Sequence, residues 1–437
     1  MDICLELYTT HVAFWSVCGI VCAMKTLADI LRERGYANQF SCEKLEEITE
    51  TPRTLYWGVD PTADSMHVGQ LMGMLVLRHF LEHGHKIVLL AGGGTGMIGD
   101  PSGRSDERNL LDDTTVARNV AAIKTQMAQV FGTDDFEMVD NADWLSKINL
   151  MEFLRDVGKH FTINQMIKKD IVRDRLEKES PISFTEFSYS LLQGYDFLHL
   201  YEHKGCDMQV GGSDQWSNIL AGVEFIRRKK EKTVYAYTWP LLINKSTGRK
   251  FGKSEGGAVW LDAKKTDPFT FYQFWVNSDD ADVEEYLLKM TLLSLDEIAE
   301  VVGEHKADTS KRVAQKRLAY EVTTIVHGKD VAAAQENVSQ VLFGSKELAD
   351  LSDKEIKLLA NTVTQKVSIG RTVVEALDDS NLASSKREAR HFISNGAIKL
   401  NGVKIEDEER EFTKDDFTHG IALLQRGKQK KLVLQLV

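Results

Sequence analysis

Cysteine and proline are scarce in this chain of 437 residues, and each scarcity limits the kinds of structure that the chain is expected to form. The five cysteines are scattered and form no CxxC pair, which is typical of reduced thiols and argues against a disulfide framework or a zinc site. All six prolines lie at or before residue 268, so the last 169 residues contain few helix breakers. This change in composition predicts a domain boundary near residue 268.

A surplus of positive charge and a membrane-spanning run are missing as well. The net charge is −11, which disfavours a protein that coats nucleic acid through its overall charge but leaves room for a local basic face. The apolar run at residues 12–23 is shorter than the roughly 20 residues that cross a bilayer, so we expect no membrane partner. Apolar residues make up 43% of the chain, enough to build cores, and the length predicts about three domains.

Residues 12–23 also resemble the apolar core of a signal peptide. Asp2 and Glu6 precede the run and no Lys or Arg does, which is the wrong charge for a secretion signal. Met24 follows at once and begins an amphipathic helical pattern. We therefore interpret residues 1–23 as a non-native upstream extension, Met24 as the natural start, and the cytoplasm as the location of the protein.

The residues up to about 260 predict an α/β domain with a parallel sheet. The apolar runs at 55–59 and 87–91 are typical of buried parallel strands, and the pattern between them predicts a helix from near Ser65 to about Gly84. A strand, a helix and a second strand in this order form a βαβ unit. Further strands are expected at 206–211 and 234–243, helices over 115–180 and from 268 to about 365, and short alternating helices and strands after that.

A glycine-rich run follows the second of these strands. Residues 94–99 match the pattern GxGxxG of dinucleotide-binding folds, in which a helix begins directly after the strand. Asp100 and Pro101 instead predict a turn, so we reject a dinucleotide site. The glycines still indicate that the backbone closely approaches a ligand or another segment.

Two short motifs carry possible chemistry, although each alone has an ordinary explanation. His67 and Gln70 lie just inside the predicted helix, on one face of its first turn, where backbone N–H groups favour an anion. Lys250 and Lys253 lie in a loop with four glycines, which suits a polyphosphate whose charge is met in the transition state. Considered alone, the first motif is explained as an ordinary exposed histidine at a helix start. The second motif, considered alone, is explained as a solvated basic loop.

Together these motifs resemble the HIGH and KMSKS signatures of the class I aminoacyl-tRNA synthetases. The stretches LYWGVDPTADSMHVGQL, GGGTGMIGDPSGR, SFTEFSYSLLQGYDF and QVGGSDQW are similar to those of the bacterial-type tyrosyl-tRNA synthetases, in the same order. The resemblance extends from about residue 27 to the C-terminus and implies a tyrosine--tRNA ligase. Such an enzyme activates L-tyrosine with ATP and transfers it to tRNA(Tyr). The resemblance also implies a homodimer, and Mg²⁺ that enters with the ATP, with no resident metal and no tightly bound cofactor.

The resemblance further implies how the chain is divided. A Rossmann-like catalytic domain with a helical connective insert is expected at residues 24–260, after the extension at 1–23. An α-helical anticodon-side domain is expected at 261–350, and a small α+β RNA-binding domain at 365–437.

The resemblance also assigns residues to a tyrosine site and an ATP site. Tyr56 and Asp196 are implied to contact the phenol hydroxyl, which separates tyrosine from phenylalanine because phenylalanine would leave these buried groups unpaired. Asp100 is the implied counter-ion of the α-amino group. The other implied tyrosine contacts are Tyr189, Gln193, Gln209 and Gln215. The implied ATP contacts are Asp60, Thr62, His67, Gly69, Gln70, Gly212, Asp214, Lys250, Lys253 and Ser254, of which His67, Gln70, Lys250 and Lys253 are expected to be catalytic.

One position departs from the family pattern, and two other functions remain as alternatives. Gln70 stands where the HIGH motif has its second histidine, and its amide is still able to donate a hydrogen bond to a ribose oxygen. The alternatives are a tryptophan-specific relative and an RNA-binding protein without catalysis. The pair of Tyr56 and Asp196 and the complete lysine loop favour the tyrosine enzyme. Basic residues of the two later domains are expected to contact tRNA, namely Lys311, Arg312, Lys386, Arg387 and Arg390.

Overall fold

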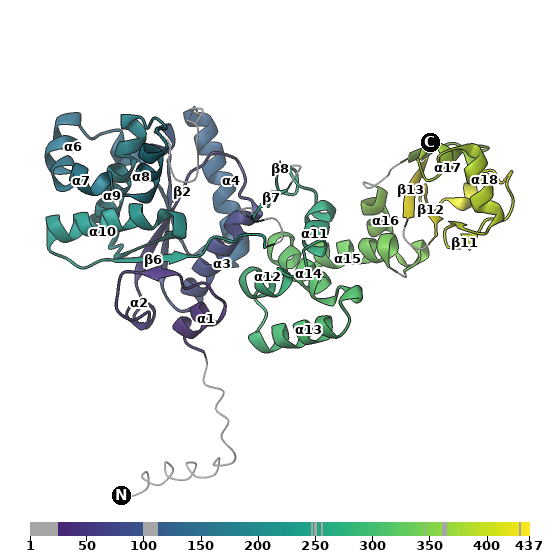
Figure 1. Cartoon of the computed structure of the whole chain (residues 1–437), viewed down its shortest axis with the longest axis horizontal. Helices are drawn as coiled ribbons and strands as arrows, with labels where there is room; N and C mark the ends of the chain where they lie inside the picture. Colours follow the sequence, from purple (N-terminus) through teal and green to yellow (C-terminus); the bar gives the residue numbers. More distant parts are fainter. Residues whose placement is uncertain are drawn as a thin grey trace, which may run out of the picture.

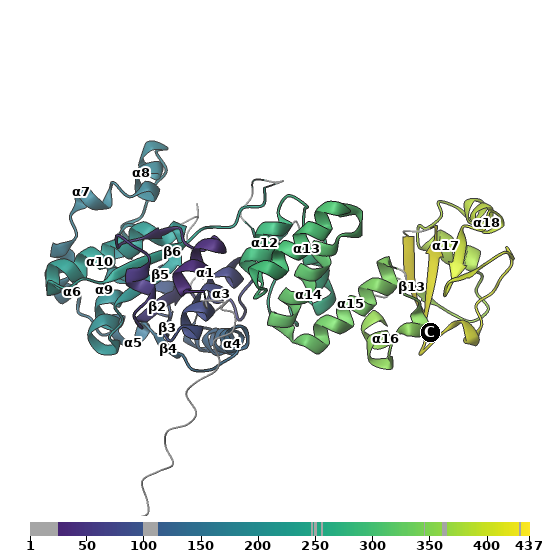
Figure 2. The same cartoon turned by 90° about the horizontal axis from the view of Figure 1, so that it is seen from below.

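The structure is a computed structural model that describes residues 25–98, 112–245, 248, 251–254, 257–344, 346–360, 365–427 and 430–437. The predicted extension at 1–23 lies outside the described residues. Three parts follow one another along the molecule, an α/β part, an all-helical part and a small α+β part, and the last lies farthest from the first (Figure 1). The same order is visible from below (Figure 2). In the part of the chain that the structure describes, no helix is long and apolar enough to cross a membrane.

The α/β part is built on a sheet of six strands in the order β1-β6-β5-β2-β3-β4. Five of them are parallel to their neighbours, and only β1 pairs antiparallel, at the edge. The predicted parallel sheet is thus confirmed, but two strands were missed. The short edge strand β1 carried no signal. The strand β4 was missed inside the region predicted to be helical, because its first residue is exposed, the other three are half buried, and they form no apolar run. The strands are β1 Gln39–Phe40, β2 Thr54–Val59, β3 Lys86–Ala91, β4 Glu137–Asp140, β5 Met208–Gly212 and β6 Tyr235–Trp239.

The two faces of this sheet belong to different cores because side chains alternate along a strand. Leu55 and Trp57 of β2 lie in the core that includes α1 Leu27–Glu33, α3 Val68–Glu82 and α4 Asp113–Phe131. Tyr56 points to the other face, where α9 Phe184–Lys204 and α10 Trp216–Lys230 pack. The smaller helices of this part are α2 Glu46–Thr49, α5 Ala142–Leu145, α6 Leu150–Asp156, α7 Ile163–Met166 and α8 Asp170–Glu177.

The helical part continues the first of these cores. Side chains from Leu27 to Val326 form one apolar cluster, so the change of architecture near residue 260 is not a gap in the packing. A core continuous between two parts resists their separation, since opening it would expose apolar surface to water. The helices of this part are α11 Pro268–Val276, α12 Val283–Met290, α13 Leu295–Ala307, α14 Val313–His327 and α15 Lys329–Phe343.

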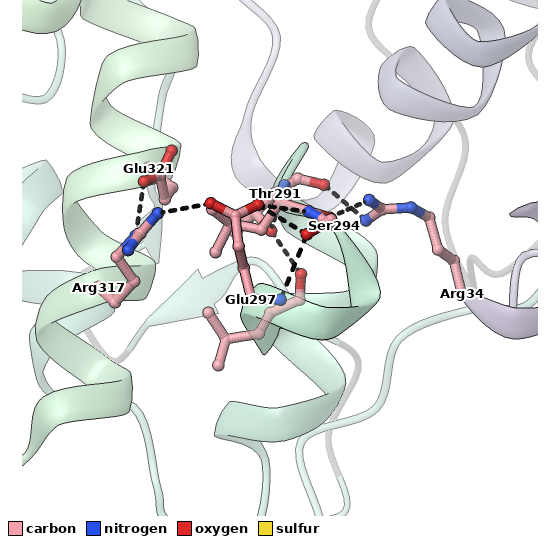
Figure 3. A network of polar contacts seen from close by, with 8 residues as sticks. Arg34, Thr291, Ser294, Glu297, Arg317 and Glu321 are labelled. Atoms are coloured by element: carbon pink, nitrogen blue, oxygen red, sulfur yellow. Dashed lines mark hydrogen bonds and ion pairs between the residues drawn. The ribbon is translucent and has the colours of Figure 1, made fainter. Parts of the chain in front are cut away.

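Arg34 at the end of α1 adds a polar connection between the two parts (Figure 3). Its guanidinium is nearly buried and donates to the backbone carbonyls of Leu288 and Thr291 at 2.8 Å each, and to that of Leu293. These carbonyls lie at the C-terminal end of α12 and just after it, where a helix has unpaired acceptors and a partial negative charge. The connection from α1 therefore holds the loop between α12 and α13 in one place.

The C-terminal part is a five-stranded sheet covered on both faces. Its order is β11-β10-β12-β13-β9, with Ala422 and Leu424 facing α17 and α18 while Ile421 and Leu423 face α15 and α16. The amino group of Lys431 in β13 donates to the carbonyls of Val341 and Gly344 at the end of α15. The elements are α16 Asp353–Ala360, β9 Gln365–Val367, α17 Val373–Asp379, α18 Lys386–Ser394, β10 Ile398–Leu400, β11 Val403–Lys404, β12 Ile421–Arg426 and β13 Lys430–Leu436.

Candidate active site

Two neighbouring residues of the sheet each bury a polar atom that has no hydrogen-bond partner among the described residues. Tyr56 of β2 is fully buried, and Gln209 is its direct neighbour in the register of β2 and β5. Among the described residues, neither the Tyr56 hydroxyl nor the Gln209 Oε1 has a partner. Leaving such a group unpaired costs roughly 1–3 kcal/mol, so this arrangement indicates a polar ligand.

Asp196 supplies the charge of this site from α9. Its carboxylate is almost completely buried and accepts hydrogen bonds from Asn141 Nδ2 at 2.9 Å and from Trp144 Nε1 at 2.7 Å. Its pKa is raised to about 7: burial raises the pKa most, the two hydrogen bonds lower it, and the nearby carboxylates of Asp140 and Asp60 raise it. Burial and then the Asp196 carboxylate raise the pKa of Tyr56 well above its ordinary value, so the Tyr56 hydroxyl stays protonated.

Asn141 and Trp144 were not predicted from the sequence. Asn141 follows β4 and is fully buried, and its side chain also accepts from the backbone N–H of Gly94 at 2.8 Å and donates to Thr95 Oγ1 at 2.9 Å. It therefore joins the glycine-rich run to Asp196. The missed strand β4 explains the omission, because polar residues at the C-terminal end of a parallel strand are where ligand sites are sought in α/β sheets.

The glycine-rich run serves this network and not a dinucleotide. In the described residues that follow β3, up to residue 98, a short 3₁₀ turn, Thr95–Met97, stands where a dinucleotide fold would begin a long helix. An added Cβ at Gly93 would overlap the carboxylate of Asp140, and one at Gly94 would lie 3.2 Å from Asn141 Oδ1. The predicted close approach of the backbone is thus to the side chains that follow β4.

The helix α9 carries the other predicted tyrosine residues. A capping box between Ser183 and Glu186 begins α9, and Tyr189, Gln193 and Asp196 then fall four and three residues apart, so they share one face. Tyr189 is buried and Gln193 half buried. Asp100, the predicted counter-ion of the amino group, lies outside the described residues.

The prediction that His67 lies inside the first turn of the helix was wrong. His67 does not lie inside the first turn of α3 but precedes it as the N-cap, with extended backbone, and its Nδ1 accepts from the Gly69 N–H at 3.1 Å. Gln70 returns the interaction, because its Oε1 accepts from the His67 N–H at 3.1 Å. The residue that replaces the second motif histidine therefore completes a capping box, an arrangement that glutamine at this position commonly provides.

The loop with the two lysines lies directly against this helix start. An added Cβ at Gly252 would lie only 2.9 Å from both Cα and N of Gly69, so the two glycine backbones are in contact. Phe251 is buried among Trp275 and Tyr286 of the helical part and anchors the loop there. Lys250 and the side chains of Lys253 and Ser254 lie outside the described part of the chain. The backbone of the latter two residues forms strand β7 Lys253–Ser254, which pairs in a hairpin with β8 Gly257–Ala258.

The segment that follows the hairpin also contacts the start of α3. Val68 donates its backbone N–H to the carbonyl of Val259 at 2.9 Å, and the ring of His67 meets that of Trp260 edge to face at 6.1 Å. Residues separated by about 190 positions in the sequence therefore lie together, as the resemblance implied for its two signatures.

The remaining predicted ATP residues follow two neighbouring strands. Asp60 and Thr62 come directly after β2, while Gly212 ends β5 and Asp214 and Gln215 form a 3₁₀ turn before α10. Because β2 and β5 are parallel neighbours, their C-terminal ends lie at one edge of the sheet. An added Cβ at Gly212 would lie 2.8 Å from Asp214 Oδ1, which is one reason for glycine at that position.

The predicted tRNA residues lie in different surroundings. Lys386, Arg387 and Arg390 are exposed on α18, and Lys386 forms an ion pair with Glu375 at 3.2 Å. Arg312 is half buried and donates to two backbone carbonyls, that of Val276 at the end of α11 and that of Ser278 just after it, so its side chain also stabilises the helical part. Lys311 is exposed.

Family models cover nearly the whole chain. The model described as tRNA synthetases class I (W and Y) matches residues 49–344, and the model described as Tyrosine--tRNA ligase SYY-like C-terminal domain matches residues 355–434. The chain therefore belongs to the class I tRNA synthetases.

Curated relatives show to which family within this class the chain belongs. The tyrosine--tRNA ligase of Roseiflexus castenholzii is 46% identical over 427 residues, which are 95% of this chain and all of that protein. The tyrosine--tRNA ligase of Pediococcus pentosaceus is 47% identical over 415 residues, which are 92% of this chain and 98% of that protein. The chain belongs to the tyrosyl-tRNA synthetase family, which confirms the resemblance seen in the sequence.

Solved structures agree with this assignment. A C-terminally truncated mitochondrial tyrosyl-tRNA synthetase of Aspergillus nidulans is 33% identical, with a TM-score of 0.65 over 73% of this chain and 94% of that one. A tryptophanyl-tRNA synthetase of Encephalitozoon cuniculi is 14% identical, with a TM-score of 0.52 over 76% of this chain and 92% of that one, and so shares the fold alone.

Proposed function

We propose that Tyr56, Asp196 and Gln209 bind the side chain of L-tyrosine, and that the residues around the start of α3 bind ATP. The reaction forms tyrosyl-adenylate and pyrophosphate, and a ribose hydroxyl at the 3′ end of tRNA(Tyr) then takes the tyrosyl group. The observation that carries this proposal is the unpaired, buried hydroxyl of Tyr56 beside the buried carboxylate of Asp196. A phenol hydroxyl both donates and accepts, so it is able to pair both groups.

The first step needs no nucleophile from the protein. The ionised carboxylate of tyrosine attacks the α-phosphorus of ATP, a new P–O bond forms, and the bond to the pyrophosphate oxygen breaks. Catalysis of such a transfer rests on positioning and on meeting the developing charge. We propose that His67, Lys250 and Lys253 stabilise the negative charge that develops on the phosphates. Gln70 and the backbone N–H groups at the start of α3 would form hydrogen bonds with the nucleotide.

Mg²⁺ is proposed to arrive with the triphosphate. It would neutralise part of the negative charge of the phosphates, and carboxylate oxygens are among the ligands that it prefers. The Asp60 and Asp214 carboxylates, which follow β2 and β5, lie at the edge of the sheet proposed for ATP.

The assay of the first step is tyrosine-dependent exchange of pyrophosphate into ATP. We expect exchange with tyrosine, none above background with tryptophan, and only weak exchange with phenylalanine. Phenylalanine fills the same volume but leaves the Tyr56 and Asp196 groups unpaired. Exchange with tryptophan alone would support the tryptophan-specific alternative, and no exchange with any amino acid would support an RNA-binding protein without catalysis.

We further propose a homodimer formed through the small helices beside α9. Exposed apolar side chains gather on α6, α7 and the start of α9, on the side of the catalytic part that faces away from the helical part (Figures 1 and 2). Such a patch in a polar surface marks a protein contact. Its most exposed members are Leu150 at 69%, Met151 at 72% and Phe184 at 77%.

Phe184→Glu is expected to shift the protein from dimer to monomer. The substitution places a charge in the apolar contact, whereas a glutamate in the first turn of α9 is favourable for the helix itself. Sedimentation velocity of both proteins measures the change. Ile369→Glu, which alters an exposed apolar residue of the C-terminal part, is the control and should remain dimeric. A Phe184→Glu protein that stays dimeric would contradict the proposed interface.

We also place the protein in the cytoplasm. The free thiols of Cys42 and Cys206 support a reducing compartment, and burial raises the pKa of Cys206 to about 12, which keeps that thiol unreactive.

A further inference from the structure

A stack of three aromatic rings adjoins the carboxylate of Asp196. The indole of Trp144 lies parallel to the imidazole of His199, with 4.2 Å between ring centroids and 16° between planes. The imidazole of His203 lies on the opposite side of His199, at 4.1 Å and 20°. His199 and His203 are one turn apart on α9, so the helix itself sets the spacing of the two imidazoles.

The same indole is therefore held at two points by one helix. Its N–H donates to Asp196 Oδ1 at 2.7 Å, and its face rests on His199, three residues further along α9. Trp144 itself comes from the short helix α5 and is only half buried. A helix of four residues with no side-chain cap does little to fix the orientation of a large ring, so the contact with His199 contributes to it.

We propose that His199 is a positioning residue for tyrosine recognition, which holds the Trp144 indole so that its N–H points at the Asp196 carboxylate. This inference rests on the function proposed above for Asp196. Offset parallel rings attract each other beyond their apolar contact, and a flat neutral imidazole suits that role. Burial and then the neighbouring His203 lower the pKa of His199, which keeps the ring neutral.

A double-mutant cycle tests whether His199 acts through the indole N–H. Trp144→Phe keeps a ring for stacking but removes the donor, and we expect it to raise the KM for tyrosine in pyrophosphate exchange about tenfold. His199→Ala is expected to raise that KM about fivefold, with kcat and the KM for ATP nearly unchanged. In the Trp144→Phe background, His199→Ala should add nothing, because the hydrogen bond that it positions is already gone.

Two further variants separate positioning from general stability. His199→Phe keeps a flat ring and should restore the KM for tyrosine to within about twofold of the unaltered enzyme. Glu202→Ala changes the same helix at a residue paired with Lys230 and should leave this KM unchanged.

The outcomes distinguish this inference from the proposed function. The inference is overturned if His199→Ala leaves the KM for tyrosine unchanged, raises it equally in the Trp144→Phe background, or is not rescued by His199→Phe. Absence of tyrosine-dependent exchange in the unaltered protein would instead overturn the proposed function.

Discussion

Asp196→Asn is expected to lower kcat/KM for tyrosine activation about 100- to 1000-fold. The variant removes a buried anionic acceptor, and the new amide group would confront the donors Asn141 and Trp144. A hydrogen bond to a charged group contributes about 1.5–3 kcal/mol, and an unpaired buried donor costs about 1–3 kcal/mol, so the sum is about 2.5–6 kcal/mol and the expected loss corresponds to its lower half. Activation of phenylalanine should change little, because phenylalanine makes no bond to the carboxylate.

The pH dependence of the unaltered enzyme provides the control for this variant. The pKa of Asp196 is raised to about 7, so the carboxylate becomes protonated as the pH falls through that value. A protonated Asp196 has lost its charge as an acceptor, and the KM for tyrosine should therefore rise on the acid side and level off above pH 8. In Asp196→Asn this dependence should disappear. Retention of the same profile in the variant would show that another group is responsible.

Gly252→Ala is expected to slow adenylate formation about 100-fold while tyrosine binding stays nearly unchanged. The added Cβ would lie 2.9 Å from the backbone of Gly69, and the φ of Gly252 is +99°, so the loop must move away from the start of α3. Displacement of a positioning group by about 1 Å is enough for a loss of this size. Rapid-quench measurement of tyrosyl-adenylate, together with equilibrium binding of tyrosine, separates the two effects.

Gly257→Ala is the matched control for this prediction. Gly257 belongs to the same hairpin and also has a positive φ, +110°, but an added Cβ there would meet nothing within 4 Å. Its backbone strain is therefore comparable, while the contact with α3 is preserved, and we expect a loss of no more than about tenfold. Equal losses in the two variants would indicate that strain, and not the contact between the two glycines, accounts for the result.

The catalytic region was predictable where its sequence is continuous and its residues are distinctive. The apolar runs of β2 and β3 were recognised because both faces of a parallel strand are buried. The helix α9 and its polar face of Tyr189, Gln193 and Asp196 were likewise predicted correctly as one element. The roles assigned to these residues came from the resemblance and remain proposals.

The strand β4 and the residues after it were not predictable in the same way. Its first residue is exposed and the other three are half buried, without alternation, so no periodic signal distinguishes them from the surrounding helices. Asn141 and Trp144 could have been found only from the position that β4 takes beside β3, which is a property of the sheet. The stacking of Trp144 on His199 depends in turn on that position.

The sequence by itself determined the family, the order of the three parts and the two signature motifs, because these depend on residue types at short spacing. Only the tertiary structure decided that His67 caps α3 from outside, that Gly252 rests on Gly69, and that Asn141 and Trp144 hold the carboxylate of Asp196. Each of these contacts joins residues from different elements or depends on backbone geometry at a helix boundary. Local patterns carry no information on such contacts, since they exist only once the sheet, its helices and the helical part have packed together.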